Sequence, residues 1–219
     1  MFTITKIPLD KICGWTVYIN GHKQRIEMIE VKSQFGTLTY GVRPEGYDSW
    51  VFKEQGGGGA VTVLYTYTPD GELYIGMILE DRPNMGDEQV WCVIGGFIKP
   101  SETHQDAQLR ESVEEAGINV KAEQLPGLPM VSNRLFFVAD VRCGEGVHAY
   151  ALNVPFDQLK LIDEQMGAKG GFRFAEENIK LGDFKKANQV TFFNWRDAIK
   201  ITPDALGRAA IAQLLADVL

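Results

Sequence analysis

The sequence contains few cysteines and no long apolar run. Only three cysteines occur among its 219 residues, and Cys13, Cys92 and Cys143 are too far apart for the Cys-x-x-Cys spacing of a metal or redox pair. We therefore expect reduced thiols. No apolar stretch approaches the roughly 20 residues needed to cross a bilayer, and the first residues lack a secretory apolar core. We expect a cytoplasmic protein that has no membrane partner.

Basic residues are in the minority. Lys and Arg total 22 against 29 Asp and Glu, which gives a formal net charge of −7. A protein that follows a nucleic-acid backbone relies on clustered Lys and Arg to release counterions, so the composition argues against nucleic acid as a partner. Small anionic substrates remain open, because a bound divalent cation reverses the sign of a local carboxylate cluster.

Patterning divides the chain into two parts. The N-terminal part is β-rich, and an Asn20-Gly21 step predicts a hairpin between strands at 14–20 and 25–31. The glycine run at 55–59 interrupts this pattern. No Lys-Ser or Lys-Thr follows the run, which argues against a phosphate-binding P-loop. We predict a β-rich appendage at 1–58 and a main domain at 59–219.

The main domain combines strands with helices. Pro69-Asp70-Gly71 has the composition of a tight turn. Residues 163–171 are polar and Gly-rich, which predicts a mobile loop, and a last helix is expected to open at Thr202-Pro203. Strands are predicted at 36–42, 60–68, 72–79, 90–94, 135–142, 147–154 and 190–194. We therefore expect an α/β or α+β sandwich with a mixed sheet.

A helix is predicted over 103–116. Thr103 and Asp106 form a capping box at its start, and Gly117 provides a left-handed stop. An exposed Glu-x-x-Glu-Glu is by itself usually a solvated helix face. The 3.6-residue period predicts a packing stripe of Leu109, Val113 and Ala116 and an opposite acidic face of Glu111, Glu114 and Glu115.

The spacing around this helix is more specific than the helix itself. The fixed positions are Gly96, Glu102, Arg110, Glu111, Glu114, Glu115 and Gly117. They match the pattern G-x5-E-x7-R-E-U-x-E-E-x-G-U, in which U is a bulky aliphatic residue. Average residue usage gives a chance match on the order of one in a million. The pattern resembles the Nudix box, the signature of the Nudix hydrolase superfamily, with one departure, Ser112, at the first U position.

The resemblance implies hydrolysis of a diphosphate linkage with Mg²⁺, for which Mn²⁺ is expected to substitute, on an α/β/α sandwich. Glu111 and Glu115 would be the main metal ligands, with Glu114 in support and the carbonyl of Gly95 as a further ligand. Carboxylates on one helix suit this role because Mg²⁺ prefers oxygen ligands.

Two further roles concern Arg110 and the general base. The resemblance implies that Arg110 pairs with Glu102 and locks the loop onto the helix; the alternative is a surface ion pair worth under about 1 kcal/mol. The general base stays open between Glu111 and the predicted loop residues Glu145 and Glu164.

The appendage suggests a substrate class. It is similar in placement to that of ADP-ribose and nucleoside-diphosphate-sugar pyrophosphatases, which often dimerise through it, so the resemblance implies a homodimer and a small nucleotide-type substrate. Arg43 and Arg82 are expected to contact phosphate, and Trp50 to stack on a base. Tyr47 and Phe35 offer the same stacking, although such aromatics are more often core residues.

Several substrate alternatives stay open. Pro126 and Pro129 lie nearer the box than the proline that many ADP-ribose members carry. Nucleoside triphosphates, dinucleoside polyphosphates or a coenzyme are alternative substrates. A Nudix-like domain that only binds a nucleotide is a further alternative, which the intact box-helix glutamates disfavour.

Overall fold

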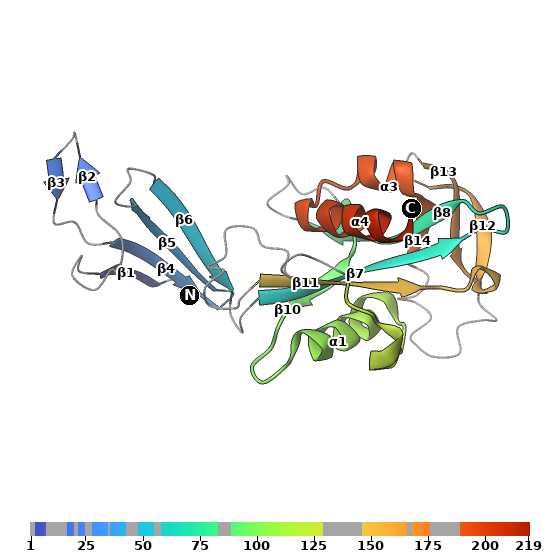
Figure 1. Ribbon diagram of the computed structural model, residues 1–219, viewed down its shortest axis with the longest axis horizontal. Helices are drawn as coiled ribbons and strands as arrows, with labels where there is room; N and C mark the ends of the chain where they lie inside the picture. The colour runs from blue at the N-terminus through green and yellow to red at the C-terminus, as the bar shows by residue number, and fades with distance from the viewer. Residues whose placement is uncertain are drawn as a thin grey trace. The chain divides into compact units, whose positions relative to one another are not determined.

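The computed structural model describes residues 3–7, 17–19, 22–24, 28–34, 36–42, 48–54, 58–82, 89–128, 146–165, 168–175 and 189–219. The chain forms two compact units (Figure 1). The first comprises Met1–Gly58 and Phe136–Gly146, and the second comprises Gly59–Leu135 and Val147–Leu219. The strand predicted at 135–142 and most of the glycine run lie outside the described residues.

In the described part of the first unit, the regular elements are strands. An antiparallel sheet has the order β1-β4-β5-β6 and consists of β1 (Thr3–Ile7), β4 (Met28–Ser33), β5 (Gly36–Val42) and β6 (Asp48–Glu54). A separate hairpin pairs β2 (Val17–Ile19) with β3 (His22–Gln24), and Ile19 lies opposite His22. The hairpin across Asn20-Gly21 is confirmed. Its second strand is wrong: β3 directly follows the turn at His22–Gln24, and residues 28–31 of the predicted segment 25–31 belong to β4.

The second unit is built on one large sheet. Its main path is β10-β7-β8-β14-β13-β12, and neighbouring strands on it are antiparallel. The strands are β7 (Gly58–Tyr67), β8 (Leu73–Asp81), β10 (Ile94–Phe97), β12 (Leu159–Gln165), β13 (Ala168–Phe174) and β14 (Thr191–Asn194). In addition, β9 (Gln89–Cys92) pairs with β8, and β11 (Gly146–Asn153) pairs with β7.

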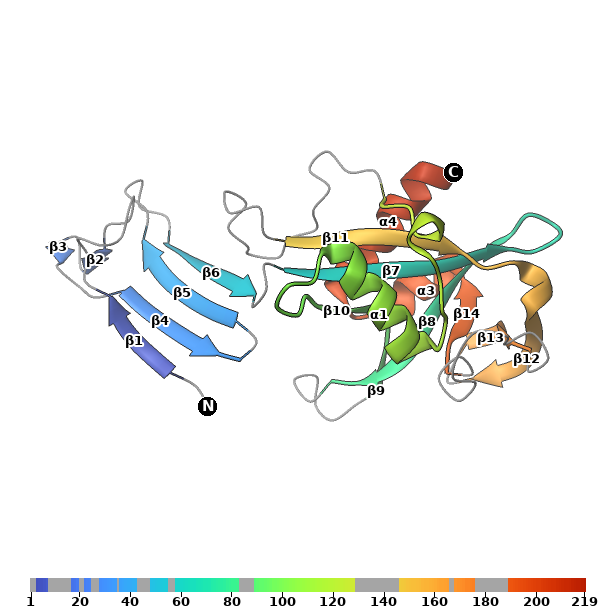
Figure 2. The same ribbon diagram turned by 90° about the horizontal axis from the view of Figure 1, so that it is seen from below.

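The sheet is mixed, as expected. The first residues of β7 and β11 lie together, since a Cβ added at Gly58 would be 1.8 Å from the carbonyl oxygen of Gly146. The two strands therefore run in the same direction, side by side (Figure 2). At the other end of β7, the predicted Pro69-Asp70-Gly71 turn is confirmed, with Gly71 at φ 86° and its N–H donating to the Thr68 carbonyl at 2.9 Å.

The loop predicted at 163–171 is wrong. Most of that segment belongs to the antiparallel strands β12 and β13, in which Glu164 lies opposite Lys169. Polar composition and glycine suggested a loop, but the flanking aromatic residues anchor the strand pair. Phe174 packs edge-to-face on Phe192, and Phe172 does so on Tyr74.

Helices cover both faces of the sheet. The helix α1 (His104–Ala116) lies on one face, and α3 (Trp195–Ile201) and α4 (Ala205–Val218) lie on the other (Figures 1 and 2). Short 3₁₀ turns occupy Ala122–Gln124 and Phe156–Gln158. The expected α/β/α sandwich is confirmed.

The predicted opening of the last helix is wrong. Thr202 is the C-cap of α3, a helix that sequence reasoning missed. The last helix, α4, is capped instead by Asp204, whose carboxylate accepts the Leu206 N–H at 3.0 Å. The Thr202 hydroxyl instead accepts the Asp204 N–H at 3.2 Å. No helix in the described part of the chain is both long and apolar enough to cross a membrane.

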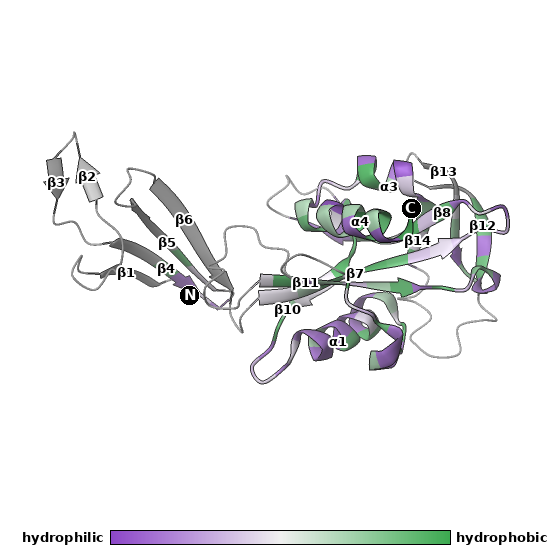
Figure 3. Cartoon of the chain, viewed as in Figure 1, coloured by the Kyte–Doolittle hydropathy of each residue, from purple (hydrophilic) through white to green (hydrophobic). Residues whose placement is uncertain are grey.

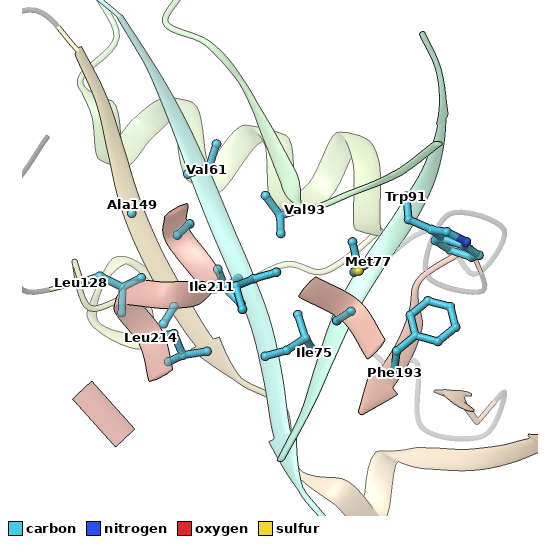
Figure 4. Close-up of a cluster of buried hydrophobic side chains, with 14 of the residues drawn as sticks. Val61, Ile75, Met77, Trp91, Val93, Leu128, Ala149, Phe193, Ile211 and Leu214 are labelled. Atoms are coloured by element: carbon cyan, nitrogen blue, oxygen red, sulfur yellow. The ribbon is translucent and has the colours of Figure 1, made fainter. Parts of the chain in front are cut away.

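Two apolar clusters hold the layers together. One lies between the sheet and α4, where Ile211 and Leu214 pack over Ile75 of β8 (Figure 4). In the same cluster Trp91 and Phe193 meet edge-to-face, with ring centroids 4.8 Å apart. The other cluster lies under α1. α1 itself is mostly hydrophilic (Figure 3), so its position depends on polar contacts as well as on burial.

Candidate active site

The helix that carries the box begins and ends as its sequence predicts. The Thr103 hydroxyl accepts the Asp106 N–H at 3.1 Å, and the Asp106 carboxylate accepts the Thr103 N–H at 3.0 Å, which completes the capping box. At the other end Gly117 adopts the left-handed conformation at φ 65°. His104, the first residue of α1, stacks on His148 of β11 with ring centroids 3.5 Å apart. These contacts fix both ends of α1.

The predicted packing face of α1 is partly wrong. Ala116 is buried, but Val113 is 42% exposed, whereas Glu111 is only 7% exposed. The residues buried against the sheet are Ala107, Gln108, Glu111, Ser112 and Ala116. The helix is therefore rotated, so that Glu111 and Glu115 face inward and only Glu114 is fully on the solvent side. Ser112, the departure from the box, is completely buried and donates to the Gln108 carbonyl at 2.9 Å.

The inward-facing carboxylates meet the backbone of two glycines. The Gly95 N–H donates to Glu115 Oε2 at 2.9 Å. A Cβ added at Gly96 would lie 2.1 Å from Glu111 Oε1, so the carboxylate occupies the space that any side chain at this position would fill. Both glycines lie in β10, which pairs with β7. The two glutamates therefore face a part of β10 that has backbone atoms but no side chains.

Arg110 joins the helix to the loop that precedes it. Its Nε donates to Glu102 Oε1 at 2.8 Å and its Nη2 to Glu102 Oε2 at 3.1 Å. Nη2 also donates to the Phe97 carbonyl at 2.9 Å. Nη1 contacts Glu111 and also donates to Glu114 Oε2 at 3.0 Å. One guanidinium therefore binds the loop through Nε and Nη2 and the helix carboxylates through Nη1. The alternative of an isolated surface ion pair between Arg110 and Glu102 does not hold.

Electrostatics distinguish the inner from the outer glutamates. Hydrogen bonds from Arg110 lower the pKa of Glu102. The pKa of Glu114 is also lowered, because contacts with Arg110 outweigh its desolvation. Burial raises the pKa of Glu111, and burial raises the pKa of Glu115 to about 8 despite the Gly95 hydrogen bond. For Glu111, burial outweighs the contact with Arg110, and for Glu115 no cation is among the causes of the shift.

Sequence reasoning missed one carboxylate. This residue is Glu80, near the end of β8: after burial, its negative charge is one of the causes that raise the pKa of Glu115. The Oε2 of Glu80 accepts a hydrogen bond from Arg82 Nη2 at 2.5 Å. The period-2 alternation of β8 after Ile78 was the only sequence signal for this position.

Of the residues predicted to bind substrate, only Arg82 has a described side chain. It is half exposed and lies beside Glu80 at the edge of the carboxylate group. Trp50 lies in β6, opposite Tyr40, but its side chain is outside the described residues, and so are Arg43, Glu145, Phe35 and Tyr47. Glu164 lies in β12 instead of a loop, and its side chain is not among those described.

The donor set fits a hard divalent cation. It consists of carboxylate oxygens beside backbone groups, with no thiolate or imidazole among them. As the side chains stand, no group of three or more acidic, His or Cys residues in the described ranges is arranged to hold an ion. Arg110 occupies Glu111 and Glu114 in this arrangement. The gap left by the missing side chain of Gly96 gives Glu111 the space to lie against the backbone.

The sequence matches the NUDIX domain over residues 58–169, which is 112 of the 219 residues. The chain therefore belongs to the Nudix family, and it is a Nudix hydrolase, an enzyme that cleaves phosphorus-containing anhydrides. Nudix hydrolases generally use divalent cations. A search of curated proteins found no match.

Solved structures show similar folds at low identity. A mutT/nudix family protein from Listeria innocua is 18% identical, with TM-score 0.47, covering 74% of this chain and 93% of its own. The E. coli dihydroneopterin triphosphate pyrophosphohydrolase is 19% identical, with TM-score 0.44, covering 77% and 99%. An ADP compounds hydrolase is 13% identical, with TM-score 0.45, covering 99% and 94%. Likenesses at this level do not discriminate between substrates.

Proposed function

We propose that this enzyme hydrolyses the diphosphate linkage of a nucleoside diphosphate joined to another moiety, namely ADP-ribose or a nucleotide sugar, and that it depends on Mg²⁺. The observation that carries the proposal is the placement of Glu111 and Glu115 against the Gly95-Gly96 backbone. Glu111, Glu115, Glu114 and the Gly95 carbonyl would hold the cation. Bound there, it would neutralise the diphosphate and activate water.

The other box residues have supporting roles in this proposal. Arg110 and Glu102 keep the loop 97–102 on the helix, so that the carbonyl edge of β10 and the carboxylates of α1 stay together. Arg82 lies at the rim and is suited to contact a substrate phosphate. Glu111 is the described candidate for the general base, because burial raises its pKa. Arg43, Trp50, Glu145 and Glu164 remain predictions from sequence.

A substrate panel tests the proposal. ADP-ribose, nucleotide sugars, nucleoside triphosphates, dinucleoside polyphosphates and coenzymes are each incubated with the enzyme and Mg²⁺, and the products are separated by chromatography. We expect a nucleoside monophosphate from the first two classes. Preferential turnover of another class would contradict the proposed substrate.

Metal dependence is tested on the same substrate. We expect activity to disappear after exhaustive chelation and to return with Mg²⁺ or Mn²⁺, because the donors are hard oxygens. Undiminished turnover in metal-free protein would refute the mechanism.

We further propose that residues 1–58 support a homodimer. The motivation is that they form a compact unit together with Phe136–Gly146, separate from the remainder of the chain. Light scattering on the full chain should then give twice the 24.4 kDa of one chain. A monomer mass at assay concentration would contradict this.

A further inference from the structure

Buried polar atoms without a partner occur on both β7 and α1. In the part of the chain that the structure describes, four buried side-chain oxygens have no hydrogen-bond partner: Thr62 Oγ1, Thr66 Oγ1, Gln108 Oε1 and Gln213 Oε1. Thr62 and Gln108 are completely buried. Nearly all buried polar groups in folded proteins bond to protein or to ordered water, because leaving one unpaired is costly. Ordered water is therefore a candidate partner for these two side chains.

Thr62 lies on the face of the sheet that α1 covers. It stands on β7 between Ala60 and Leu64, which both belong to the apolar cluster under α1. Because successive side chains point to opposite faces of a strand, Thr62 shares the face of these two residues. Its partner across the strand pair is Ile94 of β10. The Thr62 hydroxyl is therefore a hydrogen-bond donor within an apolar layer.

Gln108 faces β7 from the helix. It shares one side of α1 with His104 and Glu111, because residues three or four positions apart lie on the same side of a helix. His104 stacks on His148 of β11. The Glu111 carboxylate lies beside the backbone of Gly96 in β10. β7 pairs with both of these strands and lies between them (Figure 2). Gln108, which lies between His104 and Glu111 along the helix, is therefore placed over β7.

One water molecule can pair both groups. The Thr62 hydroxyl can donate to the water oxygen, and the water can donate to Gln108 Oε1, which only accepts. The amide nitrogen of Gln108 is already used, since Nε2 donates to Ser112 Oγ at 3.1 Å. Buried waters have about two to four polar partners, and these two groups supply the minimum. Ala60 and Ala107, which are completely buried on the facing surfaces of β7 and α1, have small side chains that favour space for a water.

We propose that an ordered water molecule is bound between β7 and α1, where it accepts a hydrogen bond from the Thr62 hydroxyl and donates one to Gln108 Oε1. This site goes beyond the proposed function and requires neither the metal nor a substrate. It would join the box helix to the sheet one helical turn before Glu111. The bound water accounts for two completely buried polar side chains in the layer between β7 and α1.

Oxygen-17 relaxation dispersion on the full-length protein detects the water directly, because buried water exchanges slowly with the solvent. In Thr62→Val, which has nearly the same shape but no hydroxyl, the signal should fall by the amount that a single buried water contributes. Thr62→Ser keeps the hydroxyl and should keep this contribution. Equal signals for wild type and Thr62→Val would overturn the proposal, even if the two side chains proved to be coupled by a direct hydrogen bond.

Melting temperature gives an independent readout, because the two cases differ in sign. If the hydroxyl is bonded to water, Thr62→Val removes a satisfied group and weakens the pairing of Gln108 Oε1, so the melting temperature should fall by about 2–4 °C. If the hydroxyl has no partner, the same substitution removes an unpaired buried group, and the melting temperature should rise. A rise would therefore contradict the proposed water.

Thr66→Val is the matched control. It removes the same hydroxyl from the same face of β7, and Thr66 is also buried, but four positions along the strand place it roughly 13 Å from Thr62. Combining Thr62→Val with Gln108→Met should lower the melting temperature by less than the sum of the single shifts, because both substitutions act on one water. Combining Thr66→Val with Gln108→Met should give the sum within about 1 °C. If Gln108→Met does not fold, Gln108→Leu, which also lacks the oxygen, takes its place. Additive shifts for both pairs would overturn the proposal.

Discussion

Gly96→Ala tests the placement of Glu111 by a single methyl group. An ideal Cβ at this position lies 2.1 Å from Glu111 Oε1 and 2.5 Å from its Cδ. Ordinary contact begins at 3.4 Å, so the carboxylate must move by 3.4 − 2.1 = 1.3 Å. A displacement of roughly 1 Å in a positioned catalytic group can cost about 10²-fold in rate. We therefore expect kcat/KM to fall by about 10².

The fold should survive this substitution. The atoms that must move are the far end of a flexible side chain, and Gly96 is not among the glycines with positive φ. The loss should be about 1 kcal/mol, which corresponds to about 2–4 °C in a chain of this size. Gly95→Ala differs, because its Cβ would lie 2.5 Å from the Ala60 carbonyl oxygen in the neighbouring strand. We expect that variant to lose more stability.

The assay measures initial rates, Mn²⁺ affinity and melting curves for both variants and for Gly127→Ala. Gly127 is the control, because the nearest atom to an added Cβ there is 4.0 Å away. It should behave like wild type. If Gly96→Ala keeps wild-type kcat/KM while remaining folded, Glu111 does not need its position against the backbone, and the reasoning is refuted.

Three further predictions concern the charged groups. Glu115→Gln should reduce turnover by about 10² to 10⁴ at saturating Mg²⁺ while metal-free stability stays level or rises; equal rates would show that this carboxylate is not catalytic. Because the pKa of Glu115 is raised to about 8 in the fold, its protonated form stabilises the metal-free protein at low pH. That contribution should be lost as pH rises from about 4.5 to 8. Below this window, the melting temperatures of wild type and Glu115→Gln should change with pH in parallel. Arg110→Lys should lower both melting temperature and activity, since an ammonium cannot replace the bidentate contact with Glu102; unchanged melting curves would contradict this.

Local signals in the sequence were sufficient for much of the box. The capping box at Thr103 and the stop at Gly117 depend only on residues within one turn of the helix end, and both are present. Arg110 also pairs with Glu102, as the box pattern implied; the two residues lie eight positions apart, on the helix and on the loop that precedes it. These features required no knowledge of the rest of the chain.

The face on which α1 packs was harder to predict. The helical wheel favoured apolar side chains, but the sheet side of α1 contains Gln108, Ser112 and Glu111. Ala107 and Ala116 contribute little apolar area, so hydrophobicity barely distinguishes the two sides. Gln108 and Ser112 instead hydrogen-bond each other, with Gln108 Nε2 donating to Ser112 Oγ at 3.1 Å. Polar residues face inward here because the inner edge of the helix carries the carboxylates.

Long-range pairings were beyond the reach of the sequence pattern. After burial, the charge of Glu80 on β8 helps to raise the pKa of Glu115 on α1, and nothing in the box encodes the fold that brings this charge to bear. Similarly, the polar residues of β12 and β13 predicted a loop, whereas Phe172 and Phe174 anchor these strands by aromatic contacts. Such elements are decided by their partners in the sheet more than by their own composition.

The guanidinium of Arg110 explains why the box needs its particular spacing. Its Nε and Nη2 hold Glu102 and the Phe97 carbonyl, which belong to the loop. Its Nη1 contacts Glu111 and Glu114, which belong to the helix. Different nitrogens hold the two sets, so the loop edge would stay in place if the helix carboxylates bound the proposed cation. Arg110 therefore limits repulsion among these carboxylates as they stand, and it would still anchor the loop if they bound the proposed cation.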